Sequence, residues 1–102
     1  MVAKLDKDGF DEVLHAGNIP AVVDFMAPWC PYCKRLSPLI EEIAASNPGK
    51  IDVFYVDIDE QPELAERYEV MTIPTVFVFE NGEARGSIVN PKTKESLLQL
   101  IF

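Results

Sequence analysis

Two cysteines, Cys30 and Cys33, are the residues of this chain best suited to covalent chemistry. They follow an apolar run and stand at the start of a predicted helix, in the segment Trp29-Cys30-Pro31-Tyr32-Cys33. A sulfur at the N-cap of a helix faces unpaired backbone N–H groups and the positive end of the helix dipole, which favours the thiolate. Cys33 lies one turn further along the same face, where we expect it to be the more buried of the two. The spacing predicts a dithiol in which Cys30 attacks a substrate disulfide and Cys33 resolves the mixed disulfide.

A Cys-x-x-Cys pair is also half of a structural zinc site, which needs four ligands. The chain has one histidine, His15, and no third cysteine. We therefore expect no metal and no bound cofactor, the redox-active group being the Cys30–Cys33 pair itself.

Asp24 is the one charged residue in the apolar run 20–27, which reads as a central strand covered on both faces. A buried, unpaired carboxylate is energetically costly, so its pKa should rise. Six residues before Cys30, Asp24 can lie beneath the helix and accept the proton of Cys33, directly or through water. The alternative is a surface residue at the end of the strand.

Strand and helix signals alternate along the chain and predict one α/β domain over residues 1–102. The predicted strands span residues 2–5, 20–27, 51–58, 74–79 and 84–89. The predicted helices run from a cap at Asp8 to residue 16, over 30–46 with Pro38 inside, over 62–68, and from a cap at Asn90 with Pro91 at the first helical position. Asn81-Gly82 predicts a tight hairpin turn.

The chain is acidic, with 17 acidic against 9 basic residues and a net charge of −8. Such a chain is repelled by phosphate backbones and anionic membrane surfaces, so we expect no nucleic-acid or membrane partner. The first residues lack the apolar core of a signal peptide, and the apolar runs are far shorter than a membrane span. We expect a cytoplasmic monomer.

The whole chain resembles the thioredoxin family. The resemblance rests on Val-Val-Asp-Phe-Met-Ala-Pro-Trp-Cys-x-x-Cys-Lys at 22–34, on Pro38, on Thr72-Ile73-Pro74-Thr75 and on Asn81-Gly82. It implies the thioredoxin fold, a central five-stranded mixed sheet flanked by four helices. It also implies that the Ile73–Pro74 bond is cis and lies against the cysteines.

The resemblance further implies a protein-disulfide reductase, an electron carrier regenerated by a thioredoxin reductase-type donor such as a flavoprotein. Its substrates would be disulfide-containing proteins, with the backbone of Ile73 pairing with an extended peptide. The implied substrate contacts are Trp29, Pro31, Tyr32, Thr72, Ile73 and Pro74.

The sequence departs from the family pattern in three places. Pro31-Tyr32 looks like glutaredoxin where thioredoxins usually have Gly-Pro, Tyr55 replaces a lysine that often pairs with the buried aspartate, and Asn90 replaces a glycine of the substrate groove. One alternative is therefore a glutathione-coupled, glutaredoxin-like oxidoreductase, although the Gly-Gly-x-x-Asp segment that binds glutathione is absent from the sequence. Another is a thioredoxin-fold binding module without turnover. The glutaredoxin-like dipeptide predicts a reduction potential above that of typical thioredoxin.

Overall fold

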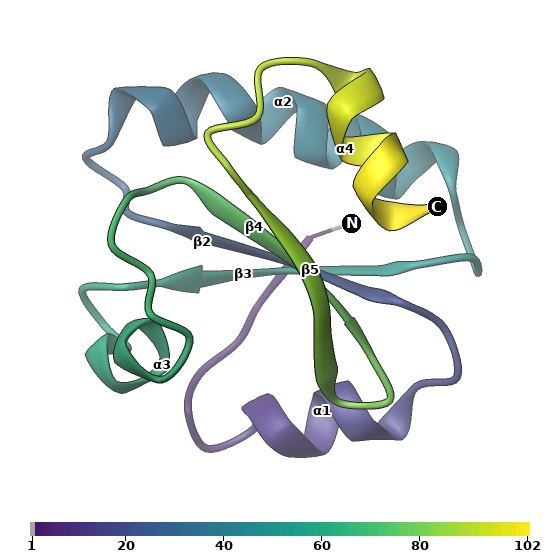
Figure 1. Cartoon of the computed structure of the whole chain (residues 1–102), viewed down its shortest axis with the longest axis horizontal. Coiled ribbons are helices and arrows are strands. Elements are labelled where there is room, and N and C mark those ends of the chain that lie inside the picture. Colours follow the sequence, from purple (N-terminus) through teal and green to yellow (C-terminus); the bar gives the residue numbers. More distant parts are fainter. Residues whose placement is uncertain (1) are drawn as a thin grey trace.

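A five-stranded mixed sheet forms the middle layer of the structure, a computed structural model that describes residues 2–102 (Figure 1). The strand order is β1-β3-β2-β4-β5; β2 is parallel to β3 and antiparallel to β4. The strands are β1 (Ala3–Lys4), β2 (Ala21–Met26), β3 (Asp52–Asp57), β4 (Thr75–Glu80) and β5 (Glu83–Val89). The helices are α1 (Phe10–Ala16), α2 (Pro31–Ser46), α3 (Pro62–Arg67) and α4 (Lys94–Ile101). The predicted thioredoxin fold of five strands and four helices is confirmed.

Helices cover both faces of the sheet, α2 and α4 on one and α1 and α3 on the other (Figure 1). The central strand β2 divides its side chains between the two layers because successive residues of a strand point to opposite faces. Val22 packs in the cluster formed with α2 and α4, whereas Val23 and Phe25 pack in the cluster formed with α1 and α3. Asp24 shares the face of Val22 and is therefore directed toward α2.

Helix α2 begins immediately after Cys30, which is its N-cap, and Pro31 occupies the first turn. Its buried positions recur at helical spacing and face the sheet; they are Cys33, Leu36, Ile40 and Ile43. Pro38 lies inside the helix, as the sequence predicted. The packing of this stripe holds the first turn of α2, and with it both cysteines, over the end of β2.

The predicted start of α1 is wrong. The helix begins at Phe10 with Gly9 as N-cap, and no side chain caps it. The carboxylate of Asp6 accepts a hydrogen bond from Gly9 N at 2.9 Å, so the turn before the helix is held by Asp6 and Asp8 remains outside it.

The predicted start of α4 is also wrong. The cap is Thr93, whose Oγ1 accepts a hydrogen bond from Ser96 N at 3.2 Å, and the helix begins at Lys94. Asn90 has a left-handed backbone with φ of 48°, and its N–H donates to the carbonyl of Pro74 at 2.8 Å. This long-range bond ties Asn90 to the segment that precedes β4. The left-handed backbone of Asn90 differs from the extended backbone of an N-cap residue, which Thr93 has with φ of −129°.

The turn between β4 and β5 matches its prediction. Asn81 and Gly82 have φ of 53° and 81°, the left-handed pair that a two-residue type I′ hairpin requires. Within residues 2–102, no helix is long and apolar enough to cross a bilayer.

Candidate active site

Cys30 and Cys33 lie in the first turn of α2 with both thiols free. The backbone N–H of Cys33 donates to Cys30 Sγ at 3.2 Å, so the sulfur of the N-cap residue takes the place that a serine or aspartate oxygen takes in ordinary helices. Such a bond stabilises negative charge on Cys30 Sγ, as does the adjacent helix N-terminus.

The two cysteines are equally buried. Each has an exposed fraction of 3%, so the expectation that Cys33 is the more buried of the two is wrong by this measure. Cys30 is covered because Ile73 of the loop before β4 packs against the cysteine cluster, together with Met26 at the end of β2. Burial, followed by its hydrogen bond with Cys30, raises the pKa of the Cys33 thiol to about 12.

Asp24 is buried beneath α2. Its exposed fraction is 5%, and Oδ1 makes no hydrogen bond to any part of the described chain. Burial raises the pKa of its carboxyl group from 3.8 to about 7. The alternative of a surface residue at the strand end is thereby excluded.

A cavity of about 400 Å³ connects Asp24 with the second cysteine. Its wall includes Asp24 and Met26 of β2, Cys33 and Ser37 of α2, and Tyr55 of β3, which is the register partner of Asp24. The negative charge of Asp24 contributes to the high pKa of Cys33. A carboxyl group whose pKa is raised to about 7 therefore shares a cavity with a thiol whose raised pKa means that it needs a base to lose its proton at neutral pH.

The loop that precedes β4, with Ile73 and Pro74, packs against the two cysteines and completes the site. The Ile73–Pro74 peptide bond is cis, Pro74 is buried, and the Ile73 carbonyl oxygen lies 4.0 Å from Cys30 Sγ. Thr72 is exposed and Ile73 half-buried. Ile73 is thus brought to Cys30, although the two residues are 43 positions apart in the sequence.

Trp29 is 64% exposed beside the thiols, and its indole Nε1 donates to Asp59 Oδ2 at 2.6 Å. The sequence reasoning missed Asp59. Its position just past β3 was a usable signal, because the carboxyl ends of parallel strands β2 and β3 lie at the same edge of the sheet. Tyr32 is 52% exposed, and the guanidinium of Arg35 lies over its ring.

No group of three or more His, Cys, Asp or Glu side chains suited to a metal ion occurs within residues 2–102. The arrangement provides one sulfur that accepts a hydrogen bond at the start of α2, a second sulfur within one helical turn, and a buried carboxyl group that shares a cavity with the second sulfur.

Comparison with known proteins agrees with this geometry. A family model described as thioredoxin matches residues 1–102. Thioredoxins from Staphylococcus haemolyticus, Staphylococcus epidermidis and Staphylococcus aureus are each 39% identical to the chain over 100 residues, which cover 98% of this chain and 94% of each relative.

Proposed function

Because this chain belongs to the thioredoxin family and is a protein-disulfide reductase with a Cys-x-x-Cys pair, we propose that Cys30 is its nucleophile, Cys33 its resolving thiol and Asp24 its proton acceptor. The observation that carries this assignment is the 3.2 Å hydrogen bond from Cys33 N to Cys30 Sγ, with Asp24 behind Cys33 across a shared cavity.

The first step uses the stabilised sulfur. The Cys30 thiolate attacks one sulfur of a substrate disulfide, the substrate S–S bond breaks, and the departing substrate thiolate takes a proton from water. The product is a mixed disulfide on Cys30. Cys33 is not suited to this attack, because burial raises the pKa of its thiol to about 12 and so disfavours its thiolate at neutral pH.

The second step needs a base. Cys33 gives its proton to the Asp24 carboxylate, directly or through water in the cavity, and its sulfur attacks Cys30 Sγ. The mixed disulfide breaks, the second substrate sulfur leaves as a thiolate and takes the proton held by Asp24, directly or through water, and a Cys30–Cys33 disulfide forms. The substrate has gained two electrons and two protons, one proton from water and one from Cys33 through Asp24. The chain, which began with Cys30 as the thiolate, has lost two electrons and the proton of Cys33.

We assign substrate contact to the exposed surface around the thiols, with Trp29, Pro31 and Tyr32 on one side and Thr72, Ile73 and Pro74 on the other. The short distance between Ile73 and Cys30 Sγ supports pairing of an extended substrate segment with the Ile73 backbone. A thioredoxin reductase-type flavoprotein would return two electrons to the disulfide. Such a reductant operates in a reducing compartment, so we place the chain in the cytoplasm. There it would act as a monomer on disulfide-containing proteins.

Glutathione coupling is the second candidate, and the exposed Pro31-Tyr32 dipeptide favours it. The experiment that separates the two compares re-reduction of the disulfide by NADPH with a thioredoxin reductase against re-reduction by glutathione, with an insulin disulfide and a glutathione mixed disulfide as substrates. Faster insulin reduction with the reductase supports the first candidate. Preference for the glutathione mixed disulfide, with glutathione as donor, establishes the second.

The dipeptide between the cysteines is expected to raise the reduction potential of the pair. We predict a value above the thioredoxin value of about −270 mV, toward the glutaredoxin range of roughly −230 to −200 mV, measured by equilibration in glutathione buffers. The matched variant changes Pro31→Gly together with Tyr32→Pro and should return the potential to about −270 mV. A wild-type value at or below that of thioredoxin contradicts the prediction.

A further inference from the structure

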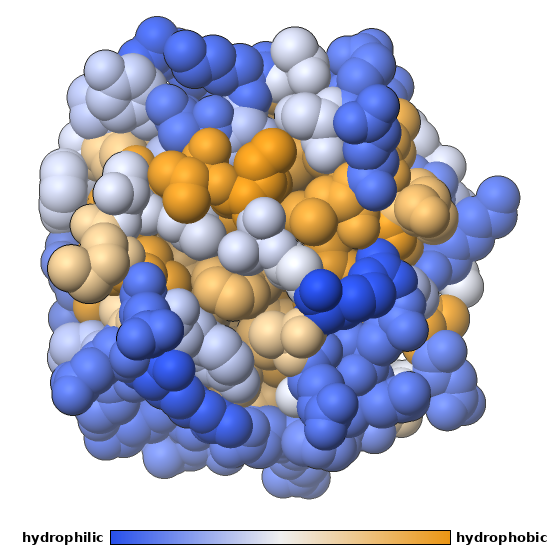
Figure 2. Space-filling view, viewed as in Figure 1, coloured by the Kyte–Doolittle hydropathy of each residue, from blue (hydrophilic) through white to orange (hydrophobic). Residues whose placement is uncertain are grey.

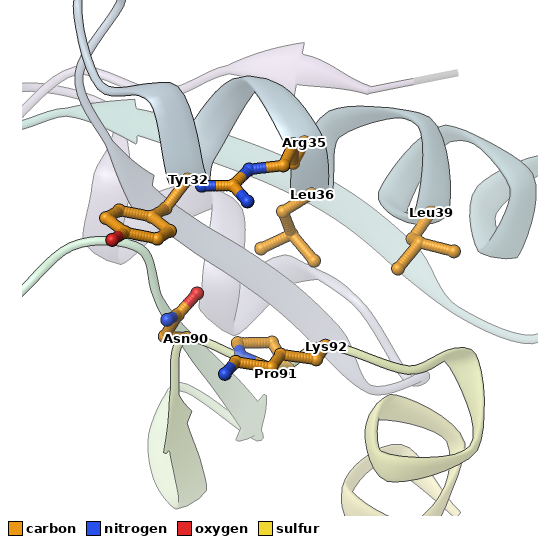
Figure 3. A pocket seen from close by; sticks show the side chains of 7 residues that line it. All are labelled: Tyr32, Arg35, Leu36, Leu39, Asn90, Pro91 and Lys92. Atoms are coloured by element: carbon orange, nitrogen blue, oxygen red, sulfur yellow. The ribbon is translucent and has the colours of Figure 1, made fainter.

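A groove of about 320 Å³ lies beside the dithiol, between α2 and the segment that leads from β5 to α4 (Figure 3). Leu36 and Leu39 extend from α2 toward this segment and line the groove with Pro91. Arg35 and Lys92 place cations on its two sides. In the space-filling view, hydrophobic surface gathers where α2 approaches the end of β5 and α4, with hydrophilic surface around it (Figure 2). The groove therefore combines an apolar lining with positive charge.

The two cations of the groove differ from most other cations of the molecule. Five basic side chains form ion pairs with carboxylates: Lys4, Lys7, Arg67, Arg85 and Lys94. Within residues 2–102, Arg35 and Lys92 form none. The chain has 17 acidic and 9 basic residues, so carboxylates that could form ion pairs are abundant. Among the described residues, none of these carboxylates pairs with Arg35 or Lys92.

Arg35 is also held in place. Its guanidinium carbon lies 4.6 Å from the centroid of the Tyr32 ring, a cation–π contact that orients the group while leaving its N–H donors free. A planar guanidinium with free donors is suited to bidentate contact with a carboxylate. A second ammonium, from Lys92, stands on the opposite wall of the same groove.

The wall of the groove is connected to the reacting sulfur by two contacts. The Ile73 carbonyl lies 4.0 Å from Cys30 Sγ, and the next carbonyl, that of Pro74, accepts the 2.8 Å hydrogen bond from Asn90 N. Asn90 is the first residue of the groove wall that contains Pro91 and Lys92, and Tyr32, between the two cysteines, lines the same groove. These contacts place the groove next to the site of a polypeptide whose disulfide lies on Cys30.

We propose that this groove is a specificity subsite that selects protein disulfides flanked by an acidic residue. The substrate carboxylate would contact Arg35 and Lys92, while an apolar side chain beside it lies on Leu36 and Leu39. The inference rests on the reductase function proposed above and names the class of substrate that this reductase prefers. The inference rests on charge complementarity. Arg35 and Lys92 would attract an acidic substrate segment to the groove, whereas the rest of the molecule, with its net charge of −8, would repel that segment.

The test compares two disulfide-linked peptides that differ only in one glutamate or glutamine beside the cysteine, at about 0.15 M salt, where a Debye length of about 8 Å screens distant carboxylates. The wild-type chain should reduce the glutamate peptide about fivefold more efficiently in kcat/KM, as one or two partly exposed charge pairs allow. Arg35→Gln with Lys92→Gln should bring the ratio to about one. Lys50→Gln, which removes an exposed cation at the turn after α2, is the matched control and should leave the ratio at its wild-type value.

Three results would overturn the proposal. The ratio for the wild-type chain is about one, or Lys50→Gln lowers it as much as the double variant does, or glutathione disulfide shows the same dependence on Arg35 and Lys92 and so identifies a free tripeptide as the occupant. If the wild-type ratio is about one but both peptides are still reduced, the specificity proposal fails and the reductase function remains supported. Failure to reduce either peptide overturns that function as well, so the two failures are distinguishable.

Discussion

Replacement of Cys30 by serine is expected to abolish protein-disulfide reduction, with a fall in rate of at least about 10³-fold, because an alcohol is a far weaker nucleophile than a thiolate. The N-cap itself survives the change, since a serine oxygen accepts the hydrogen bond from Cys33 N as well as sulfur does. The loss should therefore come from chemistry and leave the fold in place. Insulin turbidity with a saturating electron donor measures the activity, and far-ultraviolet circular dichroism checks the fold.

The same variant separates an enzyme from a binding module. If Cys30→Ser keeps the full biological effect of the chain in cells, then contact with a partner is sufficient and turnover is not the function. Lys50→Gln is the control for effects of introducing any substitution, because Lys50 lies in the turn 47–50, outside the lining of the site cavity. Residual reductase activity comparable with wild type would contradict the assignment of Cys30 as the nucleophile.

Asp24→Asn is expected to stabilise the fold at pH 8 by up to about 4 kcal/mol, the free energy that corresponds to a pKa raised from 3.8 to about 7 at roughly 1.4 kcal/mol per unit. The physical reason is that the wild-type chain must hold an ionised carboxylate with an unpaired Oδ1 inside the fold. An amide carries no charge at any pH, so the variant avoids this penalty.

The pH dependence has a definite sign. In the unfolded chain Asp24 ionises near pH 4, whereas in the folded chain it keeps its proton until about pH 7. Between these values the folded state binds more protons, so the free energy of unfolding of the wild-type chain falls as pH rises. The difference between Asp24→Asn and wild type should thus be small at pH 4, grow up to pH 7 and stay constant to pH 8.

Urea unfolding of both proteins from pH 4 to 8 measures this difference. Asp8→Asn, the same change at an exposed turn residue, is the control and should follow the wild-type curve. The Cys33 thiol titrates well above this window and does not contribute. If the free energies of unfolding of Asp24→Asn and wild type change with pH in parallel, burial of the Asp24 carboxylate does not destabilise the fold and the prediction is contradicted. Asp24→Asn should also slow release of substrate from the mixed disulfide, and an unchanged rate would remove Asp24 from the second step.

Sequence reasoning succeeds where a local pattern and a packing requirement agree. The N-cap at Cys30, the apolar stripe of α2 and the hairpin at Asn81-Gly82 each follow from signals within a few residues. Asp24 could be predicted as buried because the residues before and after it leave no polar face on β2.

The two wrong helix starts have different causes. At α1 the cause is local, because Asp6 orders the turn before the helix. At α4 a contact distant in sequence accompanies the error: Asn90 bonds to the carbonyl of Pro74 with a left-handed backbone that does not suit an N-cap, and Thr93 caps the helix. Likewise nothing local distinguishes Arg35 from Lys94, since the carboxylate that pairs with Lys94 lies 52 positions away at Glu42. Which cations stay free beside the dithiol depends on the whole fold.

The central claim is that Cys30 attacks and Cys33 resolves, and trapping tests it most directly. Reduced Cys33→Ser protein is mixed with a disulfide-linked peptide, quenched with acid and examined by intact mass and peptide mapping. The account predicts a stable one-to-one adduct through Cys30, whereas the wild-type chain releases reduced peptide and becomes an intramolecular disulfide. Absence of the Cys30 adduct, or equally fast adduct formation through Cys33 in the Cys30→Ser variant, would contradict it.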